Sequence, residues 1–239
     1  MLLAGCGFEH GAAVRLADGD VADSIADAAI DARVVPYCDP DDTSLVACYE
    51  FEGDANDGSS NMLDAQTANV TYATGRSGTA MVFGATSSAE VPDSPALDVA
   101  ALTIEAWIKP SQAPASGLRM GIIDMEGRAG FFLQDSGQIR CIASTSLQVT
   151  ANIALDTWTH VACTYDPPTL TIYVDGMAFP SVGNGGPLAT TSTTGISIAA
   201  DNPAGSGSRL IGMIDQLRLM SRARTANEIC VDAGTCDPR

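Results

Sequence analysis

The sequence is short of basic residues. It has 12 lysines and arginines against 29 aspartates and glutamates, which gives a formal net charge of −17, and Lys109 is its single lysine. Proteins that bind nucleic acids neutralise backbone phosphates with clustered lysine and arginine side chains. We therefore expect no nucleic-acid partner.

Histidines and long apolar runs are scarce as well. The two histidines are His10 and His160, and His10 lies outside the region that we expect to fold. This scarcity excludes a histidine-rich zinc site and argues against a Ser-His-Asp triad, so any catalysis would depend on carboxylates. His160 is expected to be a hydrogen-bonded strand residue. No stretch approaches the ~18 apolar residues that a membrane-spanning helix needs.

The chain begins MLLAGCG, a short run of apolar and small residues before a cysteine. Residues 3–6 resemble a bacterial lipobox, in which Cys6 becomes the lipid-modified mature N-terminus. The basic segment and most of the apolar segment of a signal peptide are missing, so either the start codon is assigned too late or the match is due to chance. With the lipid, the protein would be extracytoplasmic and anchored to a bacterial envelope membrane; without it, secreted.

The six other cysteines are an even number, which fits three disulfides in an oxidising compartment. None of them forms a Cys-x-x-Cys pair, which disfavours a metal or redox site. Cys141 and Cys163 lie in the middle of neighbouring strand-like runs, and we expect them to pair. For the rest we expect pairs that tie the ends of the domain together, namely Cys48 with Cys230 and Cys38 with Cys236.

The chain has two regions of different texture. Residues 1–44 combine the lipobox remnant with a stretch, 7–44, that holds nine acidic residues and two arginines. This composition predicts a flexible acidic tether that extends by self-repulsion. Residues 45–239 contain ten short strand-like runs separated by Gly, Pro, Asn, Asp and Ser. That pattern predicts an all-β sandwich.

Two details of the second region can be predicted from local sequence. Runs 157–166 and 169–176 are separated only by two prolines, so we expect an antiparallel hairpin. Near the end, TANEICVDAG places Thr225 three residues before Glu228 and ends in Gly234. This spacing is typical of a capping box and a helix stop, and it predicts one short C-terminal helix.

Six motifs in the second region carry a family resemblance. They are LVACYEFEGDANDGSSN, TGRSGTAMVFG, EVPDSPALDVAALTIEAWIKP, DTWTHVACTYD, TLTIYVDG and IGMIDQLRLMSRARTANEI. In this order, over about residues 45–232, they resemble the LamG-like jelly roll of the concanavalin A-like lectin and glucanase superfamily. The resemblance implies a β-sandwich of two antiparallel sheets, one often concave, with ligand sites in the loops at its rim.

The loop EGDANDGSSN is a candidate for structural calcium, because it is dense in hard oxygen ligands. Its acidic side chains are Glu52, Asp54 and Asp57. In superfamily members that the chain resembles, a carbonyl of an early loop and an aspartate of a late strand share one cation, and Asp215 matches the late position. The alternative is that Asp215 pairs with an arginine such as Arg218 or caps a turn, and that the loop is a solvated connection.

The run IIDMEG contains two carboxylates at the spacing of a glycosidase motif. Glucanases of the superfamily carry three carboxylates at alternate positions of one strand, which act as nucleophile, helper and general acid. Asp124 and Glu126 have the required spacing, but the nucleophile position is Ile122. Retaining hydrolysis of this type is therefore disfavoured, and we predict no catalytic residues. The simpler interpretation of Asp124 and Glu126 is a polar strand end.

Three hypotheses for function follow. The first is a non-catalytic, extracytoplasmic recognition module that binds a glycan or a protein partner at the bacterial cell surface. The second is a structural or adhesive surface protein without a discrete ligand, and the third is a carbohydrate-active enzyme. The sequence has two Trp, five Tyr and six Phe, so few aromatics remain for sugar binding once a core is filled. This lowers the glycan version relative to a protein partner but leaves polar lectin-like binding open.

Overall fold

The structure is a computed structural model that describes residues 36–144, 147–189, 193–201 and 208–237. The chain divides into two units, residues 1–34 and 35–239, and only the second is described below. Cys6 and residues 1–35 of the expected tether lie outside the described residues. Within the described ranges, no helix has the length and apolarity to cross a membrane.

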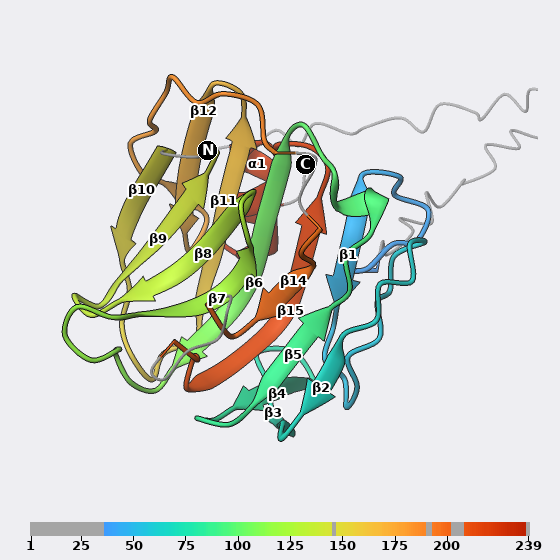
Figure 1. Cartoon of the computed structure of the whole chain (residues 1–239), viewed down its shortest axis with the longest axis vertical. Helices are drawn as coiled ribbons and strands as arrows, with labels where there is room; N and C mark the ends of the chain where they lie inside the picture. The colour runs from blue at the N-terminus through green and yellow to red at the C-terminus, as the bar shows by residue number, and fades with distance from the viewer. Residues whose placement is uncertain (1–35, 145–146, 190–192, 202–207, 238–239) are drawn as a thin grey trace, which may run out of the picture. The chain divides into compact units, whose positions relative to one another are not determined.

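The second unit is a sandwich of two antiparallel sheets, as the sequence predicts (Figure 1). The eight-stranded sheet consists of β1 (Leu45–Tyr49), β3 (Thr71–Thr74), β4 (Thr79–Phe83), β6 (Leu102–Pro110), β11 (Thr159–Asp166), β12 (Thr169–Val174), β13 (Met177–Ala178) and β15 (Gly212–Met220). The seven-stranded sheet consists of β2 (Gln66–Ala68), β5 (Ser88–Val91), β7 (Arg119–Met125), β8 (Ala129–Gln134), β9 (Gln138–Ala143), β10 (Leu147–Asn152) and β14 (Ile196–Ile198).

The order of strands follows a jelly roll. The eight-stranded sheet runs β13-β12-β11-β6-β15-β4-β3, with β1 also paired to β15, and the seven-stranded sheet runs β10-β9-β8-β7-β14-β5-β2. The expected hairpin is confirmed, because β11 pairs antiparallel with β12. A 3₁₀ helix, η1 (Pro95–Leu97), precedes β6.

The core lies between the sheets and is filled by alternate residues of each strand. In β6, for example, Ile104 and Ile108 are fully buried in it. The opposite face of β6 is covered too. Trp107 is only 8% exposed there, because the Arg76 guanidinium lies 4.5 Å from its ring centroid and the His160 ring packs edge-on at 5.2 Å.

The single α-helix of the described residues, α1 (Ala226–Asp232), begins and ends where the sequence predicts. Thr225 and Glu228 form a reciprocal capping box, and Gly234 follows in the left-handed conformation at φ +70°. Ile229 packs on Ala162 and Tyr173, which face outward from the eight-stranded sheet. The helix therefore covers the outer face of that sheet, and Figure 1 shows it behind β11.

Three disulfides are present in the described residues. Cys141–Cys163 joins β9 to β11 and so links the two sheets, in agreement with the expected pair. The other two are local, Cys38–Cys48 and Cys230–Cys236, with Cα–Cα distances of 5.6 and 5.3 Å. The pairs Cys48–Cys230 and Cys38–Cys236 expected from the sequence are therefore wrong, because each cysteine has a partner within its own end of the unit. The Cys38–Cys48 bond also joins residues 36–44 to β1.

Candidate functional site

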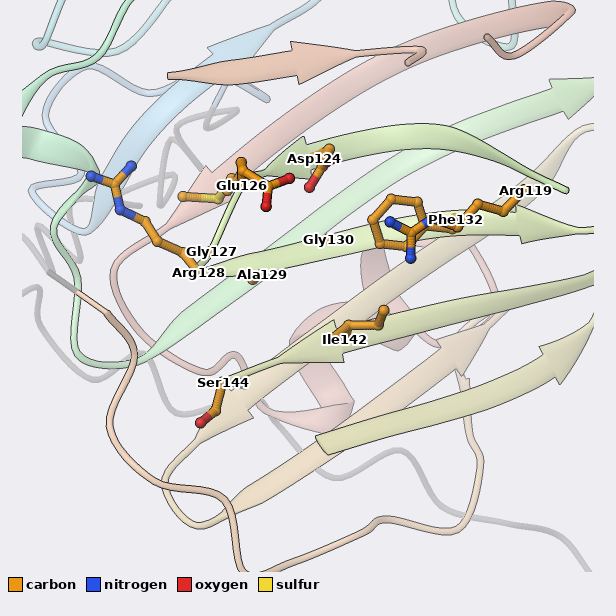
Figure 2. Close-up of a pocket in the computed structure, with 11 residues that line it drawn as sticks. Arg119, Asp124, Glu126, Gly127, Arg128, Ala129, Gly130, Phe132, Ile142 and Ser144 are labelled. Carbon is orange, nitrogen blue, oxygen red and sulfur yellow. The ribbon is translucent and has the colours of Figure 1, made fainter. Parts of the chain in front are cut away.

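The outer face of the seven-stranded sheet carries a pocket of about 290 Å³ at the β7–β8 turn. We call it the carboxylate pocket, and its lining residues are Arg119, Asp124, Met125, Glu126, Gly127, Arg128, Ala129, Gly130, Phe132, Ile142 and Ser144. Figure 2 shows Asp124 and Glu126 together at one end, with Arg119 and Phe132 at the other. The pocket thus places negative charge and positive charge at opposite ends.

Strand register explains why these side chains meet. Asp124 of β7 is directly opposite Gly130 of β8, which in turn is opposite Ile142 of β9. Directly opposed residues of antiparallel strands point to the same face. Their neighbours in sequence, such as Met125 and Cys141, belong to the core. The row Asp124–Gly130–Ile142 therefore lies on the outer face by strict alternation.

Gly130 makes the hollow between Asp124 and Ile142. A Cβ atom at this position would lie 2.4 Å from the Phe132 ring and 3.2 Å from Asp124 Oδ1. Ile142 is half-buried, so part of its apolar side chain remains available at the floor. The pocket therefore has a floor of small and aliphatic groups beneath polar walls.

At the end of the pocket opposite Asp124 and Glu126, the Arg119 side chain is held in one conformation. Arg119 Nε and Nη2 donate to the two carboxylate oxygens of Asp201, at 2.7 and 2.8 Å, and the pKa of Arg119 is raised by this hydrogen bonding. The guanidinium carbon also lies 4.1 Å from the Phe132 ring centroid. A bidentate ion pair and a cation–π contact hold one conformation together, so Arg119 is preorganised.

The acidic end lies at a tight turn. Arg128 N–H donates to the Met125 carbonyl at 2.8 Å, and Gly127 takes a positive φ of +76° that favours glycine. The Arg128 side chain points away from the centre of the pocket (Figure 2) and pairs with Asp98 at 2.8 Å. This contact anchors the turn to the segment after η1, which positions Glu126.

The glucanase-like triplet does not form on β7. Ile122 is fully buried in the core, whereas Asp124 lines the pocket on the outer face. In a regular strand, positions 122 and 124 would lie on the same face. They lie on different faces here because β7 has a β-bulge, a register shift between Gly121 and Ile123. Asp124 and Glu126, interpreted from sequence as a polar strand end, are therefore walls of a pocket.

Two of the four expected calcium ligands accept hydrogen bonds that organise the early loop. Asp57 accepts hydrogen bonds from the backbone N–H groups of Cys48, Ser59 and Leu63 at 2.8–2.9 Å. Asp54 accepts one from Asn56 N–H at 3.0 Å at an exposed position. Both carboxylates thus have the role of turn-forming acceptors.

The other two hold the loop between β3 and β4. Asp215 Oδ2 accepts from the N–H groups of Arg76 and Ser77, at 2.8 and 3.0 Å, and Glu52 accepts from Thr79 N–H at 2.9 Å. Burial raises the pKa of Asp215 although the backbone donors oppose it, and its Oδ1 is buried without a hydrogen-bond partner.

The expected calcium site stays a prediction. Among the described residues, no group of three or more His, Cys, Asp or Glu side chains is arranged to hold a metal ion. The alternative pairing of Asp215 with Arg218 is also absent from the described contacts, because Arg218 pairs with Glu105 and Asp232. Asp215 caps the loop between β3 and β4.

A second polar cluster lies on the outer face of the eight-stranded sheet, and its charged side chains pair with one another. Glu105 is fully buried and contacts His160 Nε2 at 3.0 Å and Arg218 at 3.3 Å, and it also pairs with Arg224. Burial opposes ionisation, but the hydrogen bond from His160 and the two arginine charges lower the pKa of Glu105 to about 2. His160 is a hydrogen-bonded strand residue, as the sequence predicts.

Several pocket residues escaped the sequence analysis. Arg119, Gly130, Phe132 and Ile142 come from three strands, and no motif joins them in sequence. The available signal was alternation: with Cys141 directed to the core by its disulfide to the other sheet, Ile142 must face outward.

A model of the concanavalin A-like lectin/glucanases superfamily matches residues 83–230, which include the strands that build the carboxylate pocket. The chain belongs to this superfamily. No curated protein sequence matches the chain at a significant level.

Solved structures share the superfamily fold at low sequence identity. Domain 4 of AbnA, an extracellular arabinanase from Geobacillus stearothermophilus solved in complex with arabinotriose, is 20% identical with a TM-score of 0.67 and covers 80% of this chain and 98% of that one. The binding domain of Paraclostridial Mosquitocidal Protein 1 is 16% identical with a TM-score of 0.68, over 80% and 52%. Trypanosoma rangeli sialidase is 17% identical with a TM-score of 0.59, over 79% and 32%. The three include a domain of an arabinanase, a binding domain and a sialidase, so the likeness is one of fold.

Proposed function

We propose that this chain is a non-catalytic glycan-binding module and that the carboxylate pocket is its binding site. The observation that carries the proposal is the pocket itself. Two carboxylates, Asp124 and Glu126, stand opposite the preorganised Arg119 above a floor that includes Gly130 and Ile142. Small-ligand sites commonly combine an apolar surface with a few polar groups that fix orientation.

The chemistry of the pocket suits a sugar ring. Ionised carboxylates only accept hydrogen bonds, and a guanidinium only donates them, so hydroxyl groups can bond at both ends. The C–H face of a ring would pack on the exposed part of Ile142. Phe132 is 2% exposed beneath Arg119, so this binding would use polar walls and an aliphatic floor rather than an aromatic platform.

The comparisons support a recognition role. One similar structure is an arabinanase domain in complex with arabinotriose, and others are binding domains of toxins. The similar sialidase is an enzyme, so the fold also occurs in enzymes. Against catalysis of the glucanase type stands Ile122, which takes the nucleophile position and lies in the core.

An extracytoplasmic location completes the proposal. The described part of the chain has three disulfides, and disulfides persist in oxidising compartments. We retain Cys6 as the proposed lipidation site. Incorporation of a palmitate analogue in a bacterial host, from a gene with a complete signal peptide, should be lost in Cys6→Ser; equal labelling of both proteins would contradict it.

The proposal is tested with the full chain on a glycan array, followed by titration calorimetry on the best oligosaccharide. Glu126→Gln should weaken binding about tenfold, because a charged acceptor is lost, and Ile142→Ser should weaken it by a similar factor through lost apolar contact. The control is Glu50→Gln, the same chemical change at an exposed site outside the pocket. The recovered oligosaccharide should be intact, since no turnover is expected.

Two results would count against a glycan site. One is binding to no glycan on the array, which would favour a structural or adhesive surface protein. The other is that Glu126→Gln and Ile142→Ser bind the glycan as tightly as the control Glu50→Gln does. That result would place the site elsewhere.

A further inference from the structure

A second hollow adjoins the carboxylate pocket on the same face. It has a volume of about 350 Å³, and we call it the arginine hollow; its lining residues are Gln134, Asp135, Ser136, Gln138, Arg140, Gln148, Val149 and Thr150. The two hollows share strand neighbours. Phe132 of the first is opposite Arg140 of the second, and Ile142 is opposite Gln148. One ligand can therefore span both.

Two guanidinium groups flank Phe132. Arg119 lies over its ring, and Arg140 is its partner on β9. Asp201 lies near both guanidinium groups, and Arg119 engages both of its carboxylate oxygens. In a chain of net charge −17, Arg140 thus lies near a carboxylate that is already paired with another arginine.

Arg140 has no carboxylate partner among the described residues. Its Nη1 makes one long hydrogen bond to Gln148 Oε1 at 3.4 Å, and its Nε is buried without a partner. Burial and the neighbouring Arg119 lower the pKa of Arg140, and Asp201 only partly opposes them. Asp135, the one carboxylate lining the hollow, accepts from Gly117 N–H at 2.7 Å instead. An anion beside Arg140 would relieve this imbalance.

We propose that the arginine hollow binds the anionic group of an acidic oligosaccharide, a carboxylate or a sulfate, through Arg140 with Arg119 beside it. The inference rests on the proposed glycan-binding function and names its ligand class. Carboxylates and sulfates match the planar donor fork of a guanidinium. The amide groups of Gln138 and Gln148 add neutral donors for adjacent hydroxyls.

The two hollows also fix the direction of the ligand. Asp124 and Glu126 repel an anion from the carboxylate pocket, so the acidic sugar belongs at Arg140 and a sugar presenting hydroxyls belongs at the acidic end. A ligand with acid groups on every ring fits less well than one in which acidic and neutral units alternate.

The test compares matched probes by titration calorimetry on the full chain. A hyaluronan tetrasaccharide, in which glucuronate alternates with a neutral sugar, is compared with its methyl ester, and a κ-carrageenan tetrasaccharide with its desulfated form. Each pair differs only in the anionic group, so the first reports on carboxylates and the second on sulfates. We expect the acidic member of at least one pair to bind about tenfold more tightly than its neutral partner, or better. This advantage in affinity should shrink as salt is added.

Arg140→Gln should abolish this advantage, so that the acidic and neutral members bind with equal affinity. Arg140→Lys should retain part of it, since charge remains but the fork is lost. The control is Lys109→Gln, which removes one positive charge from the other sheet and should change neither affinity. Thermal unfolding of each variant verifies that the fold is intact.

The outcomes separate the two proposals. Equal binding of acidic and neutral members by the unmodified protein, or an acidic preference that persists in Arg140→Gln, overturns the arginine hollow and leaves the glycan module standing. Binding of none of the four probes, combined with no binding on the glycan array, overturns both.

Discussion

The guanidinium of Arg119 lies face-on above Phe132, 4.1 Å from the ring centroid. This contact leaves an outward-facing phenylalanine only 2% exposed. Arg119 thereby has two roles, because it shields an apolar ring from water and also presents charge to the pocket. Asp201 fixes it in both roles.

Replacing Arg119 should lower the free energy of unfolding. Arg119→Ala uncovers Phe132 and leaves Asp201 without its partner, and we expect a loss of about 1–2 kcal/mol of unfolding free energy. Asp201→Asn keeps the stacking contact and should cost less. Urea unfolding followed by tryptophan fluorescence measures both. A larger loss in Asp201→Asn would show that the ion pair, not the ring contact, dominates.

Gly130 should tolerate no side chain. In Gly130→Ala the new methyl group would meet the Phe132 ring, at 2.4 Å before relaxation, and we expect about 1–3 kcal/mol of destabilisation from overpacking. The same methyl group enters the pocket and should reduce glycan affinity. Gly137→Ala is an unsuitable control because its φ is +75°, whereas Gly183→Ala has open space around it and should leave glycan affinity unchanged. Wild-type stability and affinity in Gly130→Ala would contradict the close packing.

Glu105 should be essential to the stability of the eight-stranded sheet. Glu105→Gln leaves Arg218 and Arg224 without a buried counter-charge, and breaking a buried ion pair in this way costs about 3–5 kcal/mol. Guanidinium chloride unfolding is the measurement. Glu50→Gln, at an exposed site, should stay within about 0.5 kcal/mol of the unmodified protein.

Acid should weaken the same cluster in a defined range. The pKa of Glu105 falls from its ordinary 4.5 to about 2 in the folded state, and that of Glu228, hydrogen-bonded to Arg222, does so as well. The unfolded carboxyls then bind protons first, so the unfolding free energy should fall as pH drops from about 4.5 towards 2. Glu228→Gln should make this fall shallower. A stability that stays constant over this range would contradict the lowered pKa values.

The disulfides should differ in their contribution. Cys141–Cys163 spans 22 residues and Cys230–Cys236 spans six, and loop entropy gives about 3 and 2 kcal/mol, respectively. The double variant Cys141→Ala/Cys163→Ala should therefore lose more stability than Cys230→Ala/Cys236→Ala. Peptide mapping of the oxidised protein checks the pairing, and a Cys48–Cys230 peptide would contradict the structure.

The alternation of apolar and polar residues was sufficient to predict most strands, but it did not predict the others. All ten runs found in the sequence lie in strands, because each carries buried residues from the core. The missed strands are short or mostly exposed: β3 is exposed along most of its length, and in β10 only Val149 and Ala151 are buried. Such strands form because a neighbour offers hydrogen bonds, and this information lies in the partner's sequence.

The site was harder to predict for two physical reasons. The bulge at Gly121 places Ile122 in the core and Asp124 on the outer face, and a bulge changes the face that a residue occupies without a signature in composition. The pocket also depends on cross-strand register, which brings Gly130 and Ile142 to Asp124. Asp124 and Glu126 form a pair in the sequence, but their partners lie on other strands.

The position of the described chain ends has a practical consequence. Tyr37 stacks on Arg218, and Cys236 is joined to α1 through Cys230, so both ends of the described unit lie on the eight-stranded side of the sandwich. The two hollows open on the opposite side. A biotin or a surface linker attached upstream of Tyr37 would therefore present both hollows to the solution, which makes immobilised binding assays with this protein sterically straightforward.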